Sequence, residues 1–578
     1  MKMVSVFIKK LHEPPSILDT VILCFIALFV VFDPLILSRE IRIFEVGLYL
    51  PCADAIFKGM VPFRDFFYLR GPFEIYGITA FLALLGKQLS SLYFYFYFGT
   101  LLTLFLGIFI GKEMVRTRYF LYALGLVYIV KTFPRIAFID WGGMRYAWGL
   151  MALLLMCRFF KSSRMKFIFW AGVVSAMGLL TSVEIGIYAA VAFLGASLMG
   201  LLWRLESRQV FFQSLLFFTG GFGIIFVPFV SYLIYVGAFF PYLETTYVVT
   251  TKLIVTVGHH ISSENISSFQ DAITAMINPN HALFSRMTPA YLYIFVLIFL
   301  MYQFIKKTCR LEHLCVLCLG LYGSLMYISA FRSICGPQFE MALQPSKILL
   351  FVLLEHFYFF LIETKENLCH APGQVILKQQ GAYKRMIRFG ILFLLGAFFI
   401  FTFVPCVARL HKRFFIFRAV HKISKKEKLD SLMFFSDLPH QKVDTPRTKG
   451  IMTLAPAARD ITEVTAFITA HTKDNDIVLN HPQNAAYSFF FNRPFVGKFP
   501  VFHLAWVKDP WYSEFMKDLK AAKPKYIIWP KQLNRIETLS LLGYQPNVLK
   551  YRAILDFISA HYKVVKVSDL SLIYARQL

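Results

Sequence analysis

Ten charged side chains gather in residues 38–77, directly after the first long apolar run of the sequence. Five are acidic and five are basic: Glu40, Glu45, Asp54, Asp65 and Glu74, with Arg39, Arg42, Lys58, Arg64 and Arg70. A carboxylate can take a proton from an attacking hydroxyl, and a guanidinium can hold a phosphate through two parallel hydrogen bonds. The segment therefore carries groups for proton and phosphate chemistry. A solvated loop of surface ion pairs is the alternative interpretation.

The elements that must position these charges are strongly apolar. Of the 578 residues, 57% are hydrophobic and only 16% are charged, and the mean hydropathy is +0.59. This composition excludes soluble, disordered and small disulfide-stapled classes and predicts a polytopic membrane protein. Much of the net charge of +26 lies in short loops between apolar runs, where it sets membrane orientation. No nucleic-acid partner is expected.

The apolar runs predict about eleven transmembrane helices. The first follows an N-terminal segment with Lys2, Lys9 and Lys10 and has no small-residue cleavage site, so it is predicted to be retained. The runs are 20–38, 88–111, 119–130, 146–157, 167–183, 185–203, 209–243, 287–305, 314–331, 348–354 and 389–408. A shorter run, Phe73 to Gly86, is expected to lie along the outer membrane surface instead of crossing it.

Loop charges give the predicted orientation. With the eleven predicted spans and Phe73 to Gly86 on the membrane surface, the loops on one side of the membrane hold 19 Lys and Arg, and those on the other side hold 11. The positive-inside bias therefore places the N-terminus in the cytoplasm and the C-terminus outside. One segment goes against the bias, because Arg409 to Lys428 carries eight Lys and Arg and is expected on the outer side.

The composition changes after this basic segment. Residues 1–408 are predicted to form the transmembrane domain, 409–449 a basic linker, and 450–578 a soluble extracytoplasmic α/β domain. Strand-like DIVLN and KYIIW alternate there with the helical stretches ITEVTAFITAHT and YSEFMKDLKAA. The domain has no glycine-rich phosphate-binding motif, so it shows no nucleotide-binding signature.

The nine cysteines do not indicate a disulfide framework. Most lie in or beside apolar runs, and none follows Cys406. Cys315 and Cys318 have the CxxC spacing of a zinc or redox site, but they fall inside an apolar run without a second CxxC or a nearby histidine pair. They are interpreted as small residues buried in the lipid.

Several stretches together resemble a known family. FEVGLYLPCADAIFKGMVPFRDFFYLRGPFEIYGITAFLALLG is similar to the first outer loop of multi-spanning C-type glycosyltransferases, which include protein O-mannosyltransferases and lipid A aminoarabinose transferases. WAGVVSAMGLLTSVEIGIYAAVA is similar to a glycine-spaced helix pair of this family, and AFRSICGPQFEMALQPSKILLF to one of its basic stretches. NAAYSFFFNRP, LKAAKPKYIIWP and FISAHYKVVKVSDLSLIYAR also resemble its outer-side domain.

The resemblance implies catalytic carboxylates. Glu45 falls where family members place an acidic residue in the first loop, and Asp65 is its rival for the role of base, with a structural role as the alternative. Asp140 falls in the next outer loop, where a second acid is usual, although it could instead cap the helix that starts near Gly142.

The resemblance also implies a site for the lipid phosphate. Arg332, Arg145 and Arg70 are the candidates to neutralise it, although Arg332 could simply be a charge that snorkels from a helix end. His259 and His260 could join carboxylates around a divalent metal ion, the one cofactor that the family suggests. Glu184 lies between two predicted helices and is either a functional acid or a solvated helix end.

The sequence thus predicts an integral glycosyltransferase of the bacterial inner (plasma) membrane. It would move a hexosyl or pentosyl sugar from a polyprenyl-phosphate carrier to a lipid, glycan or protein acceptor on the outer face. The missing nucleotide motif agrees with a lipid-linked donor. A transporter or lipid flippase is the main alternative, although no internal repeat supports it, and a membrane scaffold with an outer binding domain is a second.

Overall fold

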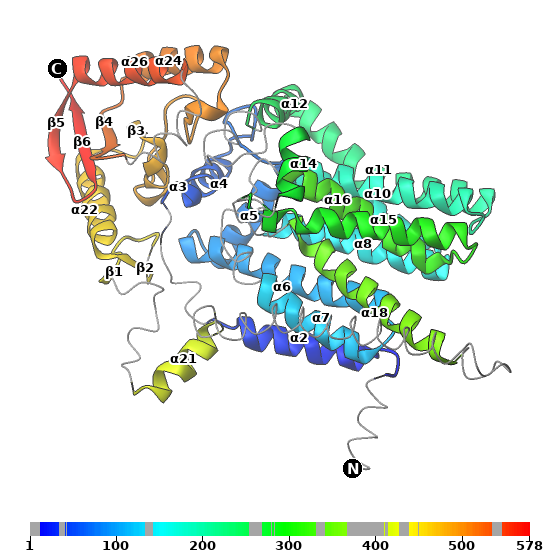
Figure 1. Ribbon diagram of the computed structural model, residues 1–578. Coiled ribbons are helices and arrows are strands. Elements are labelled where there is room, and N and C mark those ends of the chain that lie inside the picture. Colours follow the sequence, from blue (N-terminus) through cyan, green and yellow to red (C-terminus); the bar gives the residue numbers. More distant parts are fainter. Residues whose placement is uncertain are drawn as a thin grey trace.

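The computed structural model is mostly helical, with small sheets near its C-terminus (Figure 1). The structure describes residues 12–33, 41, 43–132, 143–253, 269–278, 280–281, 284–330, 342–366, 410, 414–426, 439–448, 450–533 and 546–577.

Long helices pack side by side in an antiparallel bundle (Figure 1). They are α2 (Ile17–Val31), α6 (Leu89–Met114), α7 (Arg118–Thr132), α8 (Met144–Ser162), α9 (Met165–Thr181), α10 (Val183–Leu202), α11 (Arg208–Tyr235), α15 (Thr288–Ile305), α16 (Leu311–Ala330) and α18 (Gln344–Glu366). One end of the bundle carries the C-terminal sheets and is called here the sheet end. The other end, where residues 114–118, 162–165 and 202–208 connect helices, is called the turn end.

Most predicted runs coincide with these helices to within about five residues at each end, but three differ by more at one end. The first helix lies earlier than predicted, because Ser16 caps it and accepts a hydrogen bond from the amide of Asp19. α11 ends at Tyr235, because Gly237 takes a positive φ of 71° and the chain turns into α12 (Phe239–Val248). α18 extends well beyond the predicted run of 348–354, because the helix continues through the charged residues at which the apolar run stops. The predicted run 389–408 lies outside the described residues.

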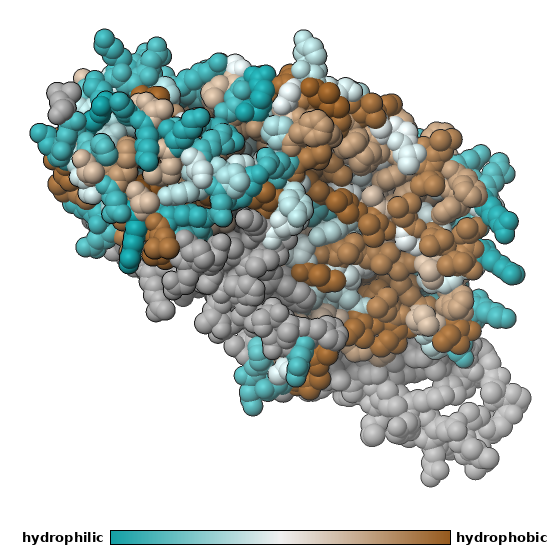
Figure 2. Space-filling model, turned by 90° about the horizontal axis from the view of Figure 1, so that it is seen from above, coloured by the Kyte–Doolittle hydropathy of each residue, from teal (hydrophilic) through white to brown (hydrophobic). Residues whose placement is uncertain are grey.

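The bundle has the apolar character of membrane helices. Among the described helices, α6, α10, α11 and α16 are long and apolar enough to cross a membrane. Apolar side chains gather over the bundle in Figure 2, whereas hydrophilic ones cover the C-terminal region and the turn end. This pattern is that of a membrane protein. The total of about eleven spans stays a prediction, as does the position of α5 (Pro72–Leu85), the fourteen-residue helix expected on the membrane surface.

Close contacts through small residues hold the bundle together. A Cβ atom on Gly172 would lie 2.1 Å from the carbonyl oxygen of Phe218, and one on Gly221 would lie 2.0 Å from that of Phe169. α9 and α11 therefore approach backbone to backbone, as small residues permit in membrane helices.

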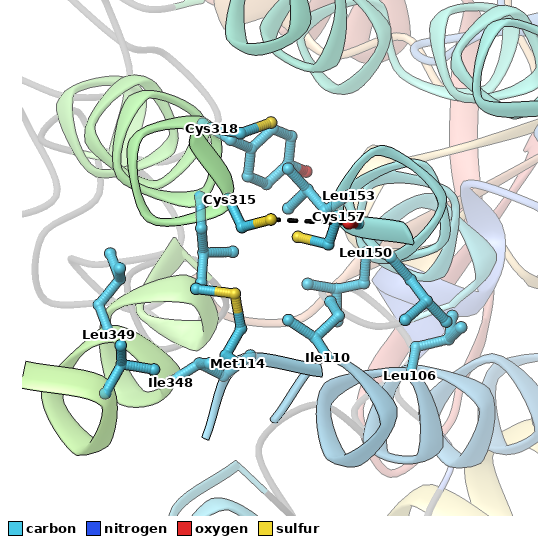
Figure 3. Close-up of a cluster of buried hydrophobic side chains, with 14 of the residues drawn as sticks. Leu106, Ile110, Met114, Leu150, Leu153, Cys157, Cys315, Cys318, Ile348 and Leu349 are labelled. Atoms are coloured by element: carbon cyan, nitrogen blue, oxygen red, sulfur yellow. Dashed lines mark hydrogen bonds between the residues drawn. The ribbon is translucent and has the colours of Figure 1, made fainter. Parts of the chain in front are cut away.

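The CxxC cysteines belong to this packing. Cys315 and Cys318 are both fully buried between α16 and α8 (Figure 3). The Cys315 thiol donates to the carbonyl oxygen of Cys157 at 3.6 Å, and Cys318 Sγ lies 3.6 Å from the sulfur of Met156. The two residues are buried in the protein interior and not against lipid, which corrects the prediction about their surroundings. Their role as small apolar residues is the one that was predicted.

The C-terminal region forms two small sheets. β3 (Val478–Asn480) pairs in parallel with β4 (Tyr526–Pro530), and β6 (Ser571–Arg576) lies antiparallel between β4 and β5 (Tyr562–Val567). β1 (His440–Lys442) and β2 (Met452–Leu454) form an antiparallel pair. The helices here are α22 (Ala455–His471), α23 (Tyr487–Phe490), α24 (Asp509–Ala522) and α26 (Pro546–His561), with 3-10 turns η7 (Pro482–Asn484) and η8 (Leu504–Trp506). DIVLN and KYIIW thus form strands, as predicted, and the two strands are neighbours in the sheet.

Short helices fill the space between the bundle and the C-terminal sheets. They are α3 (Ile43–Gly47), α4 (Leu50–Phe57), α5, α12, the π-helical turn η3 (Val249–Leu253), α14 (Phe269–Ile277) and η4 (Phe284–Arg286). α21 (Phe415–Ser424) lies apart from them, beside α2. The described part of the first charged segment, residues 41 and 43–77, therefore lies at the sheet end, against the C-terminal region (Figure 1).

Candidate functional site

Arg70 and Glu74 form a buried ion pair at the start of α5. Their closest atoms, Nη1 and Oε1, are 3.0 Å apart, and the Glu74 side chain is fully buried. The Tyr68 hydroxyl donates to the other carboxylate oxygen at 3.1 Å. Gly71 fixes this turn, because its amide donates to Thr181 and a Cβ there would lie 2.1 Å from the carbonyl oxygen of Leu180. The Glu74 carboxylate is thus held away from water at the sheet end, and the Arg70 side chain is 14% exposed.

Arg145 lies in the first turn of α8 and is also buried, with 5% of the residue exposed. Its guanidinium lies over the ring of Tyr146, 4.5 Å from the centroid. Gly143 precedes the helix with a φ of 89°, and a Cβ on Gly99 would lie 2.5 Å from its carbonyl carbon. Two glycines therefore let the start of α8 reach the middle of α6.

The two arginines converge on one group of tyrosines. The Tyr95 hydroxyl lies within electrostatic reach of Glu74, Tyr49 and both guanidinium groups. The Arg70 guanidinium also lies 5.4 Å from the centroid of the Tyr49 ring. The structure therefore brings together Arg70 and Arg145, two of the three arginines predicted to bind a lipid phosphate. No specific role was predicted for Glu74, although its spacing of four residues from Arg70 indicates an ion pair between the two side chains.

Glu45 lies on α3, a five-residue helix that contacts both η7 and α23. Its side chain is half-buried. A Cβ on Gly47 would lie 2.5 Å from the Cβ of Ala485, so glycine is needed for α3 to pack this closely against Ala485. Phe44 lies against His503 and Trp506, with ring centroids 5.8 Å apart in each case. The C-terminal region thus holds Glu45 at the boundary with the bundle.

Asp65 has a structural task in a tight turn. It accepts two hydrogen bonds from Arg64 and one from the amide of Val61, each at 2.7 Å. The turn contains Phe63 at a φ of 69°, a strained conformation for an aromatic residue, and the Asp65 contacts help to hold it. The hydrogen bonds from Arg64 lower the pKa of Asp65, and a carboxylate with a lowered pKa is a weaker base. This geometry gives Asp65 a structural role, and the choice of the base stays a prediction.

Glu184 lies in the first turn of α10 and accepts a hydrogen bond from the Ser182 hydroxyl at 2.7 Å. A carboxylate at this position also complements the helix dipole, so a helix-end role explains part of its environment. It lies within electrostatic reach of the Tyr242 and Tyr322 hydroxyls as well. Glu184 is therefore close to the polar interior of the sheet end.

Four predicted residues, Asp140, Arg332, His259 and His260, lie outside the described residues. No group of three or more His, Cys, Asp or Glu side chains with the geometry of a metal site occurs within the described ranges. The predicted roles in catalysis, phosphate binding and metal binding therefore stay predictions for these four residues.

The ion pair between Asp54 and Arg447 was not predicted, and the two residues lie 393 residues apart in the sequence. Arg447 Nη1 is 3.0 Å from Asp54 Oδ1 and donates to the carbonyl oxygen of Phe489 at the same distance. Lys58 completes the group at 2.8 Å from the Asp54 carboxylate. The contact joins α4 to the C-terminal region, and its sequence separation leaves no local pattern that could have predicted it.

The architecture is an antiparallel apolar bundle with charged short helices and a small sheet at one end. Two solved structures share it, both of ArnT from Cupriavidus metallidurans. The structure bound to undecaprenyl phosphate has a TM-score of 0.52 and 12% identity, and the alignment covers 96% of this chain and 97% of that one. For the apo state the TM-score is 0.50, with 12% identity and 96% of each chain covered.

No family model matches the sequence, and a search of curated proteins by sequence finds no match. The likeness to ArnT is therefore one of fold, and it confirms the resemblance that the sequence indicated.

Proposed function

We propose that this chain is a membrane glycosyltransferase that takes a sugar from a polyprenyl-phosphate carrier and transfers it to an acceptor hydroxyl or amine at the sheet end. The observation that carries the proposal is the convergence of Arg70 and Arg145 on the tyrosine group around Tyr95. ArnT, which shares the fold, has been solved with undecaprenyl phosphate bound. The bacterial inner membrane would be the location, with the sheet end outside.

The burial of these arginines supports a role beyond stability. Taking a guanidinium out of water costs several kcal/mol, and even a good ion pair does little more than offset that cost. Glu74 forms an ion pair with Arg70, and Arg145 lies over the ring of Tyr146. Two guanidinium groups close to each other can bind a phosphate, since each can donate two parallel hydrogen bonds.

The reaction would proceed by attack of the acceptor oxygen or nitrogen on the anomeric carbon of the donor sugar. A new glycosidic bond forms as the bond between that carbon and the phosphate oxygen breaks. The electron pair leaves with the lipid phosphate, whose negative charge Arg70 and Arg145 would stabilise. Glu45 would take the proton that the acceptor loses, so mass and charge balance without a further reactant.

The test uses the purified full-length chain with a panel of polyprenyl-phosphate sugars and candidate acceptors. Release of the lipid phosphate together with a glycosylated product is the expected result. Arg116→Gln serves as a control, because Arg116 pairs with Glu312 at the turn end, far from the proposed site. Movement of an intact lipid across the bilayer, without cleavage of the sugar–phosphate bond, would instead identify a flippase.

A further inference from the structure

The basic segment after the bundle contains an amphipathic helix, α21, with the sequence FIFRAVHKIS. Phe414, which precedes it, is buried in the core of the bundle, and Phe417 packs against that core. α21 also contacts α2, and Figure 1 shows it beside the end of α2 nearer the C-terminal sheets. The helix is therefore attached to the bundle at its sheet end.

The exposed face of α21 is apolar. Val420 and Ile423 are each 61% exposed, and Ile416, which shares this face at helical spacing, is partly exposed. Phe414 and Arg418 lie on the opposite side and are buried. A helix on the surface of a soluble domain would turn its apolar face inward, so this arrangement indicates an apolar environment outside the protein.

Apolar surface continues from α21 onto the neighbouring helix. α2 exposes Phe25 and Phe29 at 66% and 62%, as expected for a helix that faces lipid. Phe32, directly after α2, is 50% exposed. The exposed apolar face of α21 therefore lies next to one end of the lipid-facing surface of α2.

Basic side chains flank the apolar face. Lys425 and Lys426 are exposed, and His421 and Lys422 are partly exposed. Lysine side chains near an apolar face can reach phosphate groups while their stems stay in the apolar layer. The predicted orientation places these charges outside, against the positive-inside bias, and attraction to anionic lipids would explain why they are present there.

We propose that α21 lies in the plane of the membrane surface at the sheet end and binds anionic phospholipids. The apolar side chains Ile416, Val420 and Ile423 enter the bilayer, and the basic side chains Lys422, Lys425 and Lys426 contact the lipid phosphates. The chain would thereby be held against the membrane surface just before it enters β1. This inference does not depend on the proposed transferase activity.

The test places the photo-crosslinking residue benzoylphenylalanine at Val420 of the full-length chain, reconstituted in phosphatidylcholine vesicles with or without phosphatidylglycerol. Val567 is the matched control, because it is also an exposed valine, at 57%, but lies on β5. We expect a lipid adduct at position 420 and none at position 567. The yield at position 420 should fall when phosphatidylglycerol is omitted or salt is raised.

The variant Lys422→Gln/Lys425→Gln/Lys426→Gln tests the charges separately from the fold. Each lysine near an anionic surface is expected to change the ratio of docked to undocked helix by about fivefold. The triple variant should therefore lose most of the lipid adduct and keep normal expression. An adduct at position 420 with protein instead of lipid, or a lipid adduct that is independent of phosphatidylglycerol and of the three lysines, would overturn the proposal.

Discussion

The turn end and the sheet end of the bundle use charged residues differently. At the turn end, Arg116 and Glu312 form an exposed ion pair, while the buried Glu355 accepts hydrogen bonds from the amides of Arg116 and Thr117. Glu355 thereby satisfies backbone groups at the start of α7, which have no partner within the helix. These charges connect helices and complete helix ends.

At the sheet end, some charges lie inside the protein among aromatic rings. Glu74 and Arg145 are buried there, Arg70 is largely buried, and Glu45 lies at the boundary with the C-terminal region. The number of charges does not identify a site, because both ends are charged. What distinguishes the sheet end is the convergence of two largely buried positive charges that come from separate segments of the chain.

The largest effect is expected from Glu45→Gln, which keeps the shape of the side chain but cannot take up a proton. Loss of a general base typically lowers the rate by about 10² to 10⁴. The variant should express and fold normally and lose turnover with the lipid-linked sugar.

Asp65→Asn is the matched control for Glu45→Gln. It weakens the turn at Phe63, so we expect a loss of about 1 kcal/mol in stability and nearly normal turnover. A dead Asp65→Asn beside an active Glu45→Gln would move the base to Asp65. Full activity in both variants would exclude the mechanism.

Arg145→Gln tests the phosphate site with less risk to folding than a change at Arg70, which would leave Glu74 buried without its partner. Removing one group that stabilises the developing charge should lower turnover by about 10² to 10³. Arg145→Lys keeps the charge but loses the planar guanidinium, so it should recover only part of the activity. Unchanged turnover and donor dependence in Arg145→Gln would remove this residue from the site.

Glu355→Gln tests the turn end. The amide cannot accept from all three donors that Glu355 satisfies, the amides of Arg116 and Thr117 and the Thr117 hydroxyl. We expect a loss of about 1 to 3 kcal/mol in stability, measured by thermal unfolding in detergent, and normal turnover by the folded fraction. A folded but inactive variant would show that charges at the turn end also contribute to turnover, and it would contradict the difference described between the turn end and the sheet end.

The smallest effect concerns His503, which is buried and stacks on Trp506 with ring centroids 4.2 Å apart. Within the described part of the chain, neither ring nitrogen has a hydrogen-bond partner. Burial lowers the pKa of His503 to about 3. Because the unfolded chain takes up this proton at a higher pH, the native state should lose stability as the pH falls below about 6.5.

The expected loss at His503 is about 1 kcal/mol for the first pH unit below 6.5. His503→Phe keeps the stacking on Trp506 and should flatten the pH dependence of unfolding. His471 is an exposed histidine, so His471→Phe should leave that dependence unchanged. An equally steep dependence in His503→Phe would assign the acid sensitivity to other groups, of which the buried His481 is the first to test.

Part of the candidate site could be predicted from the sequence. Arg70 and Arg145 were predicted as phosphate ligands through the family resemblance, and both lie within electrostatic reach of Tyr95, while their role in binding phosphate stays a prediction. The sequence did not separate Glu45 from Asp65, because both are acids in one charged loop. The structure adds that Asp65 has a structural role, because its partners occupy its carboxylate and lower its pKa.

The helices of the bundle and the strands β3 and β4 of the C-terminal sheet follow from the sequence alone. Long apolar runs and short β-branched runs are local properties, and each is favourable in only one kind of element and environment. Which charges meet, in contrast, depends on the tertiary structure. Arg447 reaches Asp54 across 393 residues, and Arg145 reaches Tyr95 because glycines let α6 and α8 approach closely. Such contacts depend on the packing of distant segments, and no spacing along the chain encodes them.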